Sequence, residues 1–309
     1  MNTDKQHWFR VAFQFQDSVI PKVLPPVLVY GGLGALVSLL QESSLSVSLP
    51  IFGSIIPNVV FNLILGLLLV FRTNTAYERF WEGRIAWGSL IVSIRNLARQ
   101  IRIAVAEPEA IDREKKAATL QLLGAVAIAT KLHLRKEGVN SELEELLIPS
   151  QVLKIKSAKN PPLEIILWIN DYLQQQHQRN FLSADYLTAM NSLLDKMVEA
   201  VTACERIMNT PMPLAYAIHL KQLMLIYCLS LPFQIVKDLH WWTGPTVALI
   251  SFTLLGIEAI GIEIENPFGQ DANDLPLDEI CQKILDNIED FTPSNSSISS
   301  TVDALEKVI

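Results

Sequence analysis

Apolar residues are concentrated in two pairs of long stretches, one near each end of the chain. Residues 23–41 and 43–71 contain 19 and 29 residues without a charged side chain, and 239–257 contains another 19. Residues 222–236 add 15, and the apolar Leu214–Ile218 lies just before them. A helix needs about 20 mostly apolar residues to cross the roughly 30 Å hydrocarbon core of a bilayer. The pattern therefore predicts four transmembrane helices, near 23–41, 52–72, 214–236 and 240–262.

The third span has a competing interpretation, because His219 and Lys221 lie within it. A buried hairpin of a soluble core is the alternative for these residues. The first span is not expected to be a cleaved signal peptide, because charged residues precede it and no small-residue cleavage site follows. Residues 41–50, which join the first two spans, contain no Lys or Arg. By the positive-inside rule, both termini and the centre of the chain are therefore expected in the cytoplasm.

These spans divide the chain into four parts. Residues 1–72 hold an N-terminal segment with the first two spans, and 73–213 form a cytoplasmic helical region. Residues 214–264 hold the third and fourth spans, and 265–309 form a cytoplasmic C-terminal segment. The stretch Phe291–Thr301 is rich in Ser, Asn and Thr, so we expect a mobile tail there.

The central region is expected to be helical throughout. No proline occurs between Pro57 and Pro108, so the second span should continue as one helix past Arg72 into the cytoplasm. Gly83 and Gly88 are the positions at which it would bend. No hairpin signal or long repeat occurs, which predicts an all-α polytopic membrane protein. Further helices are expected at 109–136, 162–180 and 183–209.

Composition agrees with a membrane protein and excludes several other classes. Hydrophobic residues make up 50% of the chain and charged residues 18%, whereas soluble proteins usually carry about a quarter. A net charge of −7 argues against nucleic-acid binding. The three cysteines and five histidines have no metal-ligand spacing, and a disulfide framework is not expected either. No phosphate loop or nucleophile elbow occurs, so an enzyme is not predicted.

Three separated motifs carry a family resemblance. Residues 72–84 read RTNTAYERFWEGR directly after the second span, and residues 204–207 and 209–216 read CERI and NTPMPLAY before the third. After the fourth span, residues 265–269 read ENPFG and residues 273–277 read NDLPL. In this order, over about residues 5–285, the chain resembles the bestrophin family on its bacterial and cyanobacterial-type branch.

The resemblance implies a homopentameric ion channel, in which five subunits surround one pore and the second span lines a narrow apolar neck. Animal and plant members conduct chloride and other anions, while at least one bacterial branch conducts cations. We therefore expect a channel for small monovalent anions, with chloride the main candidate and bicarbonate a second. The alternatives are a monovalent cation channel of the same fold and a non-conducting membrane scaffold. The implied partners are copies of the chain, membrane lipid and small inorganic ions, in a bacterial plasma membrane or a thylakoid membrane.

Candidate pore residues lie on the second span. Ile56, Val60 and Ile64 are spaced i, i+4 and i+8, so they form one stripe along the helix. The resemblance implies that this stripe faces the pore, where a ring of apolar side chains would gate by dewetting. Without the resemblance, ordinary helix packing explains the same spacing. Asn58 and Asn62 alternate with the stripe, and either bond across helices or face the pore mouth.

A basic face is predicted farther along the same helix. Its members, which share one side at 3.6 residues per turn, are Arg84, Arg95, Arg99 and Arg102. One interpretation is an electropositive vestibule wall that raises the local concentration of anions. Salt bridges to Glu78, Glu82 or carboxylates of neighbouring helices are the favoured alternative.

Acidic residues follow the fourth span. The resemblance aligns residues 270–274 with an acidic run that binds calcium in the animal proteins. Asp271 and Asp274 hold matching ligand positions, but two intervening acids are missing. Calcium is therefore a candidate ligand, and no cofactor is required. The carboxylates that end the span are expected to cap the helix or contact arginines, rather than to bind a cation: Glu258, Glu263 and Glu265.

Overall fold

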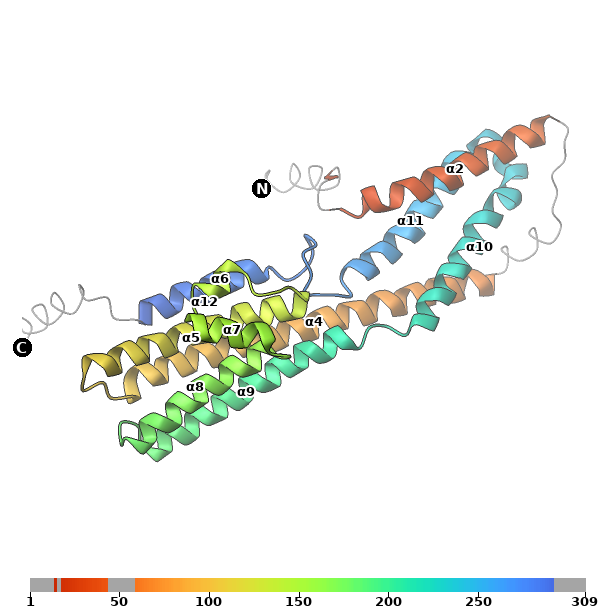
Figure 1. Cartoon of the computed structure of the whole chain (residues 1–309). Helices are drawn as coiled ribbons and strands as arrows, with labels where there is room; N and C mark the ends of the chain where they lie inside the picture. Colours follow the sequence, from red (N-terminus) through yellow and green to blue (C-terminus); the bar gives the residue numbers. More distant parts are fainter. Residues whose placement is uncertain (1–13, 16–17, 44–58, 292–309) are drawn as a thin grey trace, which may run out of the picture. The chain divides into compact units, whose positions relative to one another are not determined.

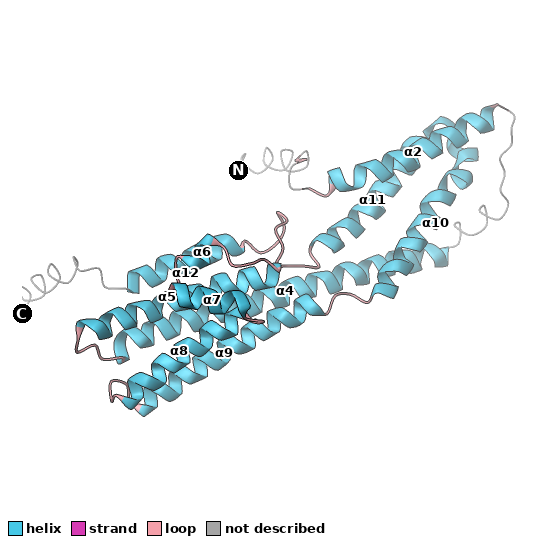
Figure 2. Cartoon of the chain, in the orientation of Figure 1, coloured by secondary structure: helices cyan, strands magenta, loops and turns pink. Residues whose placement is uncertain are grey.

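The computed structural model describes residues 14–15, 18–43 and 59–291. Every regular element in these ranges is a helix, in agreement with the all-α prediction (Figure 2). Contacts divide the chain into two units, of which the first comprises Met1–Trp81 with Thr210–Asp274. The second comprises Glu82–Asn209 with Leu275–Ile309. The predicted mobile tail lies almost entirely outside the described residues.

The first unit contains helices α2 (Ile20–Glu42), α10 (Leu214–Leu239) and α11 (Thr243–Glu263), with a short 3₁₀ turn η1 (His240–Trp242). It also contains the beginning of α4 (Val59–Ala104). Helices α2, α10 and α11 begin and end within three residues of three predicted spans. Residues 52–58 of the predicted second span lie outside the described part of the chain.

By length and composition, four stretches of the described residues are apolar enough to cross a membrane. Leu214–Glu263 is one of them and comprises both α10 and α11. Ala110–Arg135 is another, but 78% of its most apolar 18-residue stretch is buried inside the structure. The corresponding share for Ile20–Glu42 is 28%. A helix whose apolar side chains are already covered by protein has little surface to offer lipid. We therefore assign the spans to α2, the start of α4, α10 and α11.

Helices α2 and α11 lie side by side because small residues let their backbones approach (Figure 1). A Cβ atom added to Gly34 would lie 3.0 Å from the Cα atom of Gly244. A Cβ atom on Gly31 would lie 3.0 Å from the Cβ atom of Ala248. Such contacts between small residues are the usual means by which membrane helices pack closely. The Ser38 hydroxyl adds a 2.8 Å hydrogen bond to a backbone carbonyl of η1.

Helix α4 is continuous over 46 residues, about 70 Å at 1.5 Å per residue. The predicted continuation past Arg72 is therefore confirmed, and the helix breaks at neither Gly83 nor Gly88. Within the first unit it packs on α10 through a core cluster that includes Leu65 and Leu220. The Tyr216 hydroxyl of α10 donates a 2.6 Å hydrogen bond to a backbone carbonyl of α4.

The second unit is a helical bundle that also contains the remainder of α4. Three of its helices match the predicted helices 109–136, 162–180 and 183–209, namely α5 (Ala110–Arg135), α8 (Pro161–Gln178) and α9 (Ala184–Asn209). Three were not predicted: α6 (Ser141–Glu144), α7 (Pro149–Ser157) and α12 (Leu277–Phe291). Helix α12 packs on α5 and buries Cys281, Ile284 and Ile288.

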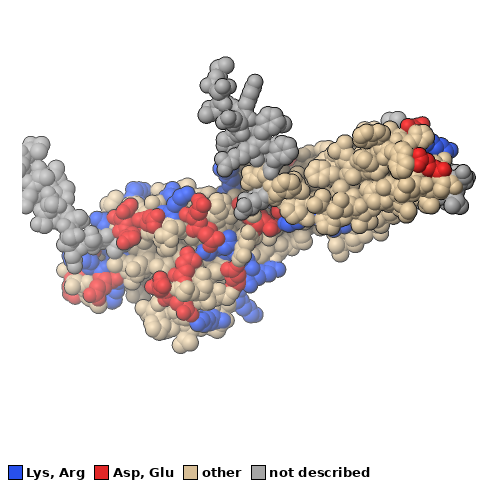
Figure 3. All heavy atoms as spheres, turned by 90° about the horizontal axis from the view of Figure 1, so that it is seen from above, with Lys and Arg blue, Asp and Glu red and all other residues tan. Residues whose placement is uncertain are grey.

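The surfaces of the two units differ in composition. In the space-filling view, uncharged side chains cover most of the first unit, and charged ones gather at one tip (Figure 3). Lys, Arg, Asp and Glu are scattered over the second unit in the same view. This contrast fits a first unit that faces lipid and a second unit that faces water.

Candidate functional site

Helix α4 has a buried side and an exposed side over its whole length. Leu65 and Leu69 are each only 3% exposed, whereas Val60 and Ile64 are 59% and 48% exposed. At 100° per residue these two pairs point to different sides of the helix. Val60 and Ile64 therefore share an exposed face of α4, and their role at a pore stays a prediction. The other predicted pore-helix residues are Asn62, which is exposed, and Ile56 and Asn58, which lie outside the described residues.

The exposed side of α4 stays apolar beyond the span. Phe71 is 54% exposed in the first unit. Ile85, Val92 and Ile103 are 58%, 57% and 66% exposed in the second unit. Lipid can cover the apolar side chains of a span, but it cannot cover those of a water-facing bundle. This face of the second unit therefore has the composition of a protein contact.

The predicted arginine face lies along one flank of the exposed side. Arg84, Arg95 and Arg99 are exposed. Arg102 is half-buried, and its guanidinium donates to the backbone carbonyl of Phe291 at the end of α12. The favoured alternative named Glu82 as a partner for the set, but the Glu82 carboxylate pairs with Arg206 of α9.

Two arginines of the first motif anchor the segments that flank α10 and α11. Arg72 is 3% exposed, and its Nη2 atom lies 3.4 Å from Oε2 of Glu265. The other oxygen of Glu265 accepts a 3.0 Å hydrogen bond from the backbone N–H of Met212. Arg79 donates to the backbone carbonyls of Glu265 and Thr210. The expected contact between Glu265 and an arginine is thus present, and it joins α4 to both of these segments.

The acidic turn after α11 holds the two predicted metal ligands. Asp271 Oδ1 lies 3.6 Å from the Nζ atom of Lys22, which lies 2.9 Å from Oε1 of Glu263. Asp274 Oδ2 accepts a 2.8 Å hydrogen bond from the backbone N–H of Asp271. Among the described residues, no three His, Cys, Asp or Glu side chains are grouped so that they could hold a metal ion. The arrangement does not fit the predicted calcium site.

Comparison with known proteins identifies the family. The model of the bacterial and fungal bestrophin proteins matches residues 1–290. The chain belongs to the bestrophin family. This bestrophin is 56% identical over 300 residues to a voltage-dependent anion channel-forming protein of Nostoc sp., a match that covers 97% of this chain and 96% of the relative. A protein of the same description from Synechocystis sp. is 52% identical over 284 residues, with 92% and 91% covered.

Solved structures support the same assignment. A bacterial bestrophin homologue from Klebsiella pneumoniae, which carries a point substitution, superposes on this bestrophin with a TM-score of 0.77. The two chains are 29% identical, and the match covers 90% of this chain and 100% of the homologue. The resemblance of the three motifs to this family is therefore confirmed.

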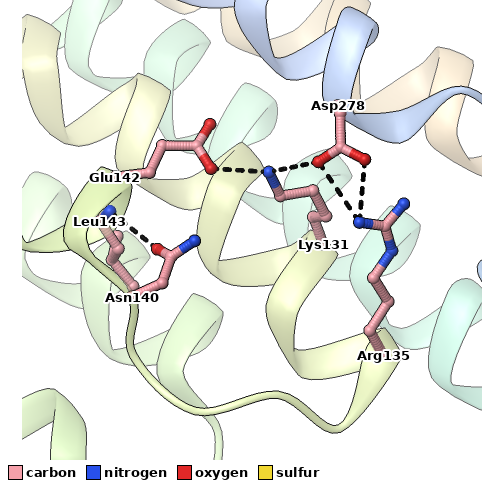
Figure 4. A network of polar contacts seen from close by, with 6 residues as sticks. All are labelled: Lys131, Arg135, Asn140, Glu142, Leu143 and Asp278. Carbon is pink, nitrogen blue, oxygen red and sulfur yellow. Dashed lines mark hydrogen bonds and ion pairs between the residues drawn. The ribbon is translucent and has the colours of Figure 1, made fainter. Parts of the chain in front are cut away.

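In the second unit of this bestrophin, a network of ion pairs ties α12 to α5 and α6 (Figure 4). The Nζ atom of Lys131 lies 2.7 Å from Glu142 Oε2 and 2.9 Å from Asp278 Oδ1, and Arg135 adds a 3.0 Å contact to Asp278. Burial alone would lower the pKa of Lys131, but hydrogen bonds to both carboxylates raise it. The hydrogen bond from Lys131, aided by Arg135, lowers the pKa of Asp278 against the opposing effect of burial.

Sequence reasoning missed Lys22 and Lys131 as structural cations. Lys131 had a usable signal, because it stands inside the apolar run of α5, where a buried charge needs a partner. Its partners, 11 and 147 positions away, could not be chosen without the fold. Lys22 gave no comparable signal, because it lies at the edge of a span, where lysines are common.

Proposed function

We propose that this bestrophin is an anion channel that passes small monovalent anions, chloride first among them, down their electrochemical gradient. The observation that carries the proposal is the 56% identity, over nearly the full length of both chains, to the channel-forming protein of Nostoc sp.. The Synechocystis relative at 52% identity carries the same description. We place the channel in a bacterial plasma membrane or a thylakoid membrane, with both termini in the cytoplasm.

We further propose that the channel is a homopentamer around one central pore. A pore needs a closed ring, and a ring of identical subunits uses the same surfaces in every subunit. The exposed apolar face of α4 supports this assembly, because Ile85, Val92 and Ile103 need a protein partner and a second copy of the chain can supply one. The number five rests on the family resemblance.

In this assembly α4 lines the pore, and Val60 and Ile64 form the neck together with Ile56. Both described members of this set are about half exposed in the single subunit, which is what a pore-facing position requires. Asn58 and Asn62 then lie next to the neck. The neck carries no charge, so the sign of the permeating ion depends on hydration cost and on the charge outside the neck.

The reversal potential tests the proposed selectivity. The current through purified protein in a planar bilayer under a tenfold KCl gradient should change sign close to the chloride equilibrium potential, about 59 mV from zero. Reversal near the potassium potential would refute the anion proposal and establish a cation channel of the same fold. If the protein is shown to be pentameric and yet passes no current at any voltage, a non-conducting scaffold would be favoured.

The neck residues are tested by shortening all three to alanine. Ile56→Ala, Val60→Ala and Ile64→Ala together should widen the constriction and raise the single-channel conductance. Leu153→Ala, at an exposed position of α7 with no proposed role in the pore or the assembly, is the control and should leave the conductance unchanged. An unchanged conductance in the triple variant would remove these residues from the gate.

The exposed arginines Arg95 and Arg99 test the vestibule. Their replacement by glutamine should shift the reversal potential away from that of chloride, because fewer positive charges would concentrate anions near the pore. Arg113→Gln changes an exposed arginine of α5 and is the control. Identical reversal potentials in all three proteins would leave the arginines with a structural role only.

A further inference from the structure

Lys22, in the first turn of α2, reaches across to the end of α11. Its Nζ atom lies 2.9 Å from Oε1 of Glu263 and 3.6 Å from Oδ1 of Asp271. The Glu263 side chain is only 9% exposed, so its carboxylate has little access to water. A carboxylate in such a place needs a cation or hydrogen-bond donors close by. Lys22 supplies the cation from a segment 241 positions away in the sequence.

Three further acceptors at this turn accept hydrogen bonds from donors of the turn itself. Glu263 Oε2 accepts a 3.2 Å hydrogen bond from the side-chain amide of Asn273. Asp274 Oδ2 accepts the backbone N–H of Asp271, and the backbone carbonyl of Asp271 accepts the N–H of Asp274 at 3.0 Å. Calcium takes six to eight oxygen ligands. The turn directs N–H groups and an ammonium toward its carboxylates, and these are the wrong partners for a metal ion.

We propose that the ammonium group of Lys22 is the resident cation of this turn and replaces the calcium ion that the family resemblance implies. A lysine ammonium is a compact point charge with three donors, so one side chain can serve two carboxylates. Because it is covalently part of α2, it holds the turn against α2 at any calcium concentration. A calcium ion could enter only by displacing a cation that the chain itself holds in place.

The cavity around this lysine supports the assignment. It measures about 260 Å³ and is lined by Lys22 and by carboxylates that include Glu258, Glu263 and Asp271. Glu258 is 8% exposed, and its Oε1 atom is buried without a hydrogen-bond partner in the described structure. Three carboxylates against one ammonium leave the cavity acidic. Removal of Lys22 should therefore make this cavity attract cations more strongly than it does in the native protein.

The connection extends from α2 to the pore helix. The segment that follows Glu263 continues directly to Glu265, which Arg72 and Arg79 of α4 hold in place. Lys22 thus completes a chain of charged contacts from α2 through the end of α11 to α4, all within the first unit. On this reasoning the link between the first span and the pore helix works without metal.

The test compares thermal unfolding of the full-length protein in detergent with 10 mM CaCl₂ and with EDTA, at constant ionic strength. The Tm of the native protein should not change with calcium. Lys22→Ala should unfold a few degrees lower in EDTA, because Glu263 loses its cation, and calcium should restore much of the loss. Terbium luminescence, titrated on the same proteins, should report binding to Lys22→Ala and not to the native protein.

Two further variants keep the test decisive. Lys237→Ala removes an exposed lysine of α10 in the same unit and should behave as the native protein does. Lys22→Ala combined with Asp271→Asn should lose the calcium response, because one of the two vacated carboxylates is gone. If Lys22→Ala does not fold, Lys22→Gln replaces it. A calcium response in the native protein as large as in the Lys22 variant, or none in either with equal Tm in EDTA, would overturn the proposal.

Discussion

The ion pairs around Lys131 determine how firmly α12 is held on α5. Removal of the carboxylates should have a different effect on stability from removal of the lysine charge. The Lys131 side chain is 4% exposed, whereas those of Glu142 and Asp278 are 32% and 65% exposed. A buried ammonium that loses its partners cannot return to water without opening the bundle. Exposed carboxylates that lose theirs can simply hydrate. The cost of a substitution therefore depends on which group is left behind.

Three variants separate these cases. Asp278→Asn leaves Lys131 paired with Glu142 and should cost about 1 kcal/mol, because the exposed carboxylate is screened by solvent. The double variant Asp278→Asn with Glu142→Gln leaves the Lys131 ammonium buried without a carboxylate, and we expect a loss of stability of about 3–5 kcal/mol. Lys131→Met keeps the volume and removes the buried charge, so its cost should stay within about 1 kcal/mol.

Hydrogen exchange of backbone amides in Leu277–Phe291, followed by mass spectrometry, measures the opening of α12 directly. A loss of about 1 kcal/mol raises the exchange rate roughly fivefold, and a loss of 3 kcal/mol raises it more than about 100-fold. Peptides from α8 report whether the rest of the bundle stays closed. If Lys131→Met opened α12 as much as the double variant, the attraction of the charges would be the main force, and the burial argument would be wrong.

Three other predictions follow from close packing and from titration. Gly34→Ala should reduce the free energy of unfolding by about 1–3 kcal/mol and lower the Tm, because the added Cβ atom would lie 3.0 Å from the backbone of α11. Gly32→Ala is the control and should leave the Tm unchanged, because its Cβ atom would have no neighbour within 4 Å. The lowered pKa of Asp278 contributes stability above about pH 3.8, and this contribution is lost as the pH falls through the pKa of Asp278 in the folded protein. The raised pKa of Lys131 contributes stability below about pH 10.5, and this contribution is lost as the pH rises through the pKa of Lys131 in the folded protein. Protection of the α12 amides, measured as the exchange rate relative to that of the unfolded chain at the same pH, should therefore be highest between these limits. Constant protection from pH 3 to pH 11 would contradict this. Burial raises the pKa of Cys281 to about 12, so maleimide should modify it slowly in the native protein and quickly once α12 is released.

The membrane helices could be predicted because their signal is local. Runs of 19 residues without charge at 23–41 and 239–257 have few other uses in a protein. The length of α4 also followed from a local fact, the absence of proline after Pro57. Helix α12 had a local signal too, since Cys281, Ile284 and Ile288 recur every three or four residues, and all three are buried against α5. That signal was missed because the segment adjoins a polar tail.

The partners of charged residues could not be predicted, because they join segments far apart in the chain. Arg72 stands in a motif that the sequence made obvious, yet its partner Glu265 is 193 positions away. Lys22 has no motif at all. The proposed neck residues show a different limit, since the exposure of Val60 and Ile64 is known for a single chain, whereas the proposed pore would be formed by several chains together. A single chain shows that this face is exposed, and only the structure of an assembly would show whether the face lines a pore.

Helix α5 shows why hydropathy alone does not separate a membrane span from the core of a bundle. It is apolar enough to cross a bilayer, yet it contains the buried lysines Lys116 and Lys131. Lys116 donates to the backbone carbonyls of Arg102 and Val105 at 2.9 and 2.8 Å, and so satisfies acceptors at the C-terminal end of α4. A lysine with such partners belongs to a protein interior, because lipid provides no acceptor for its charge. The partners of its charged residues, more than the number of its apolar ones, distinguish α5 from α2, α10 and α11.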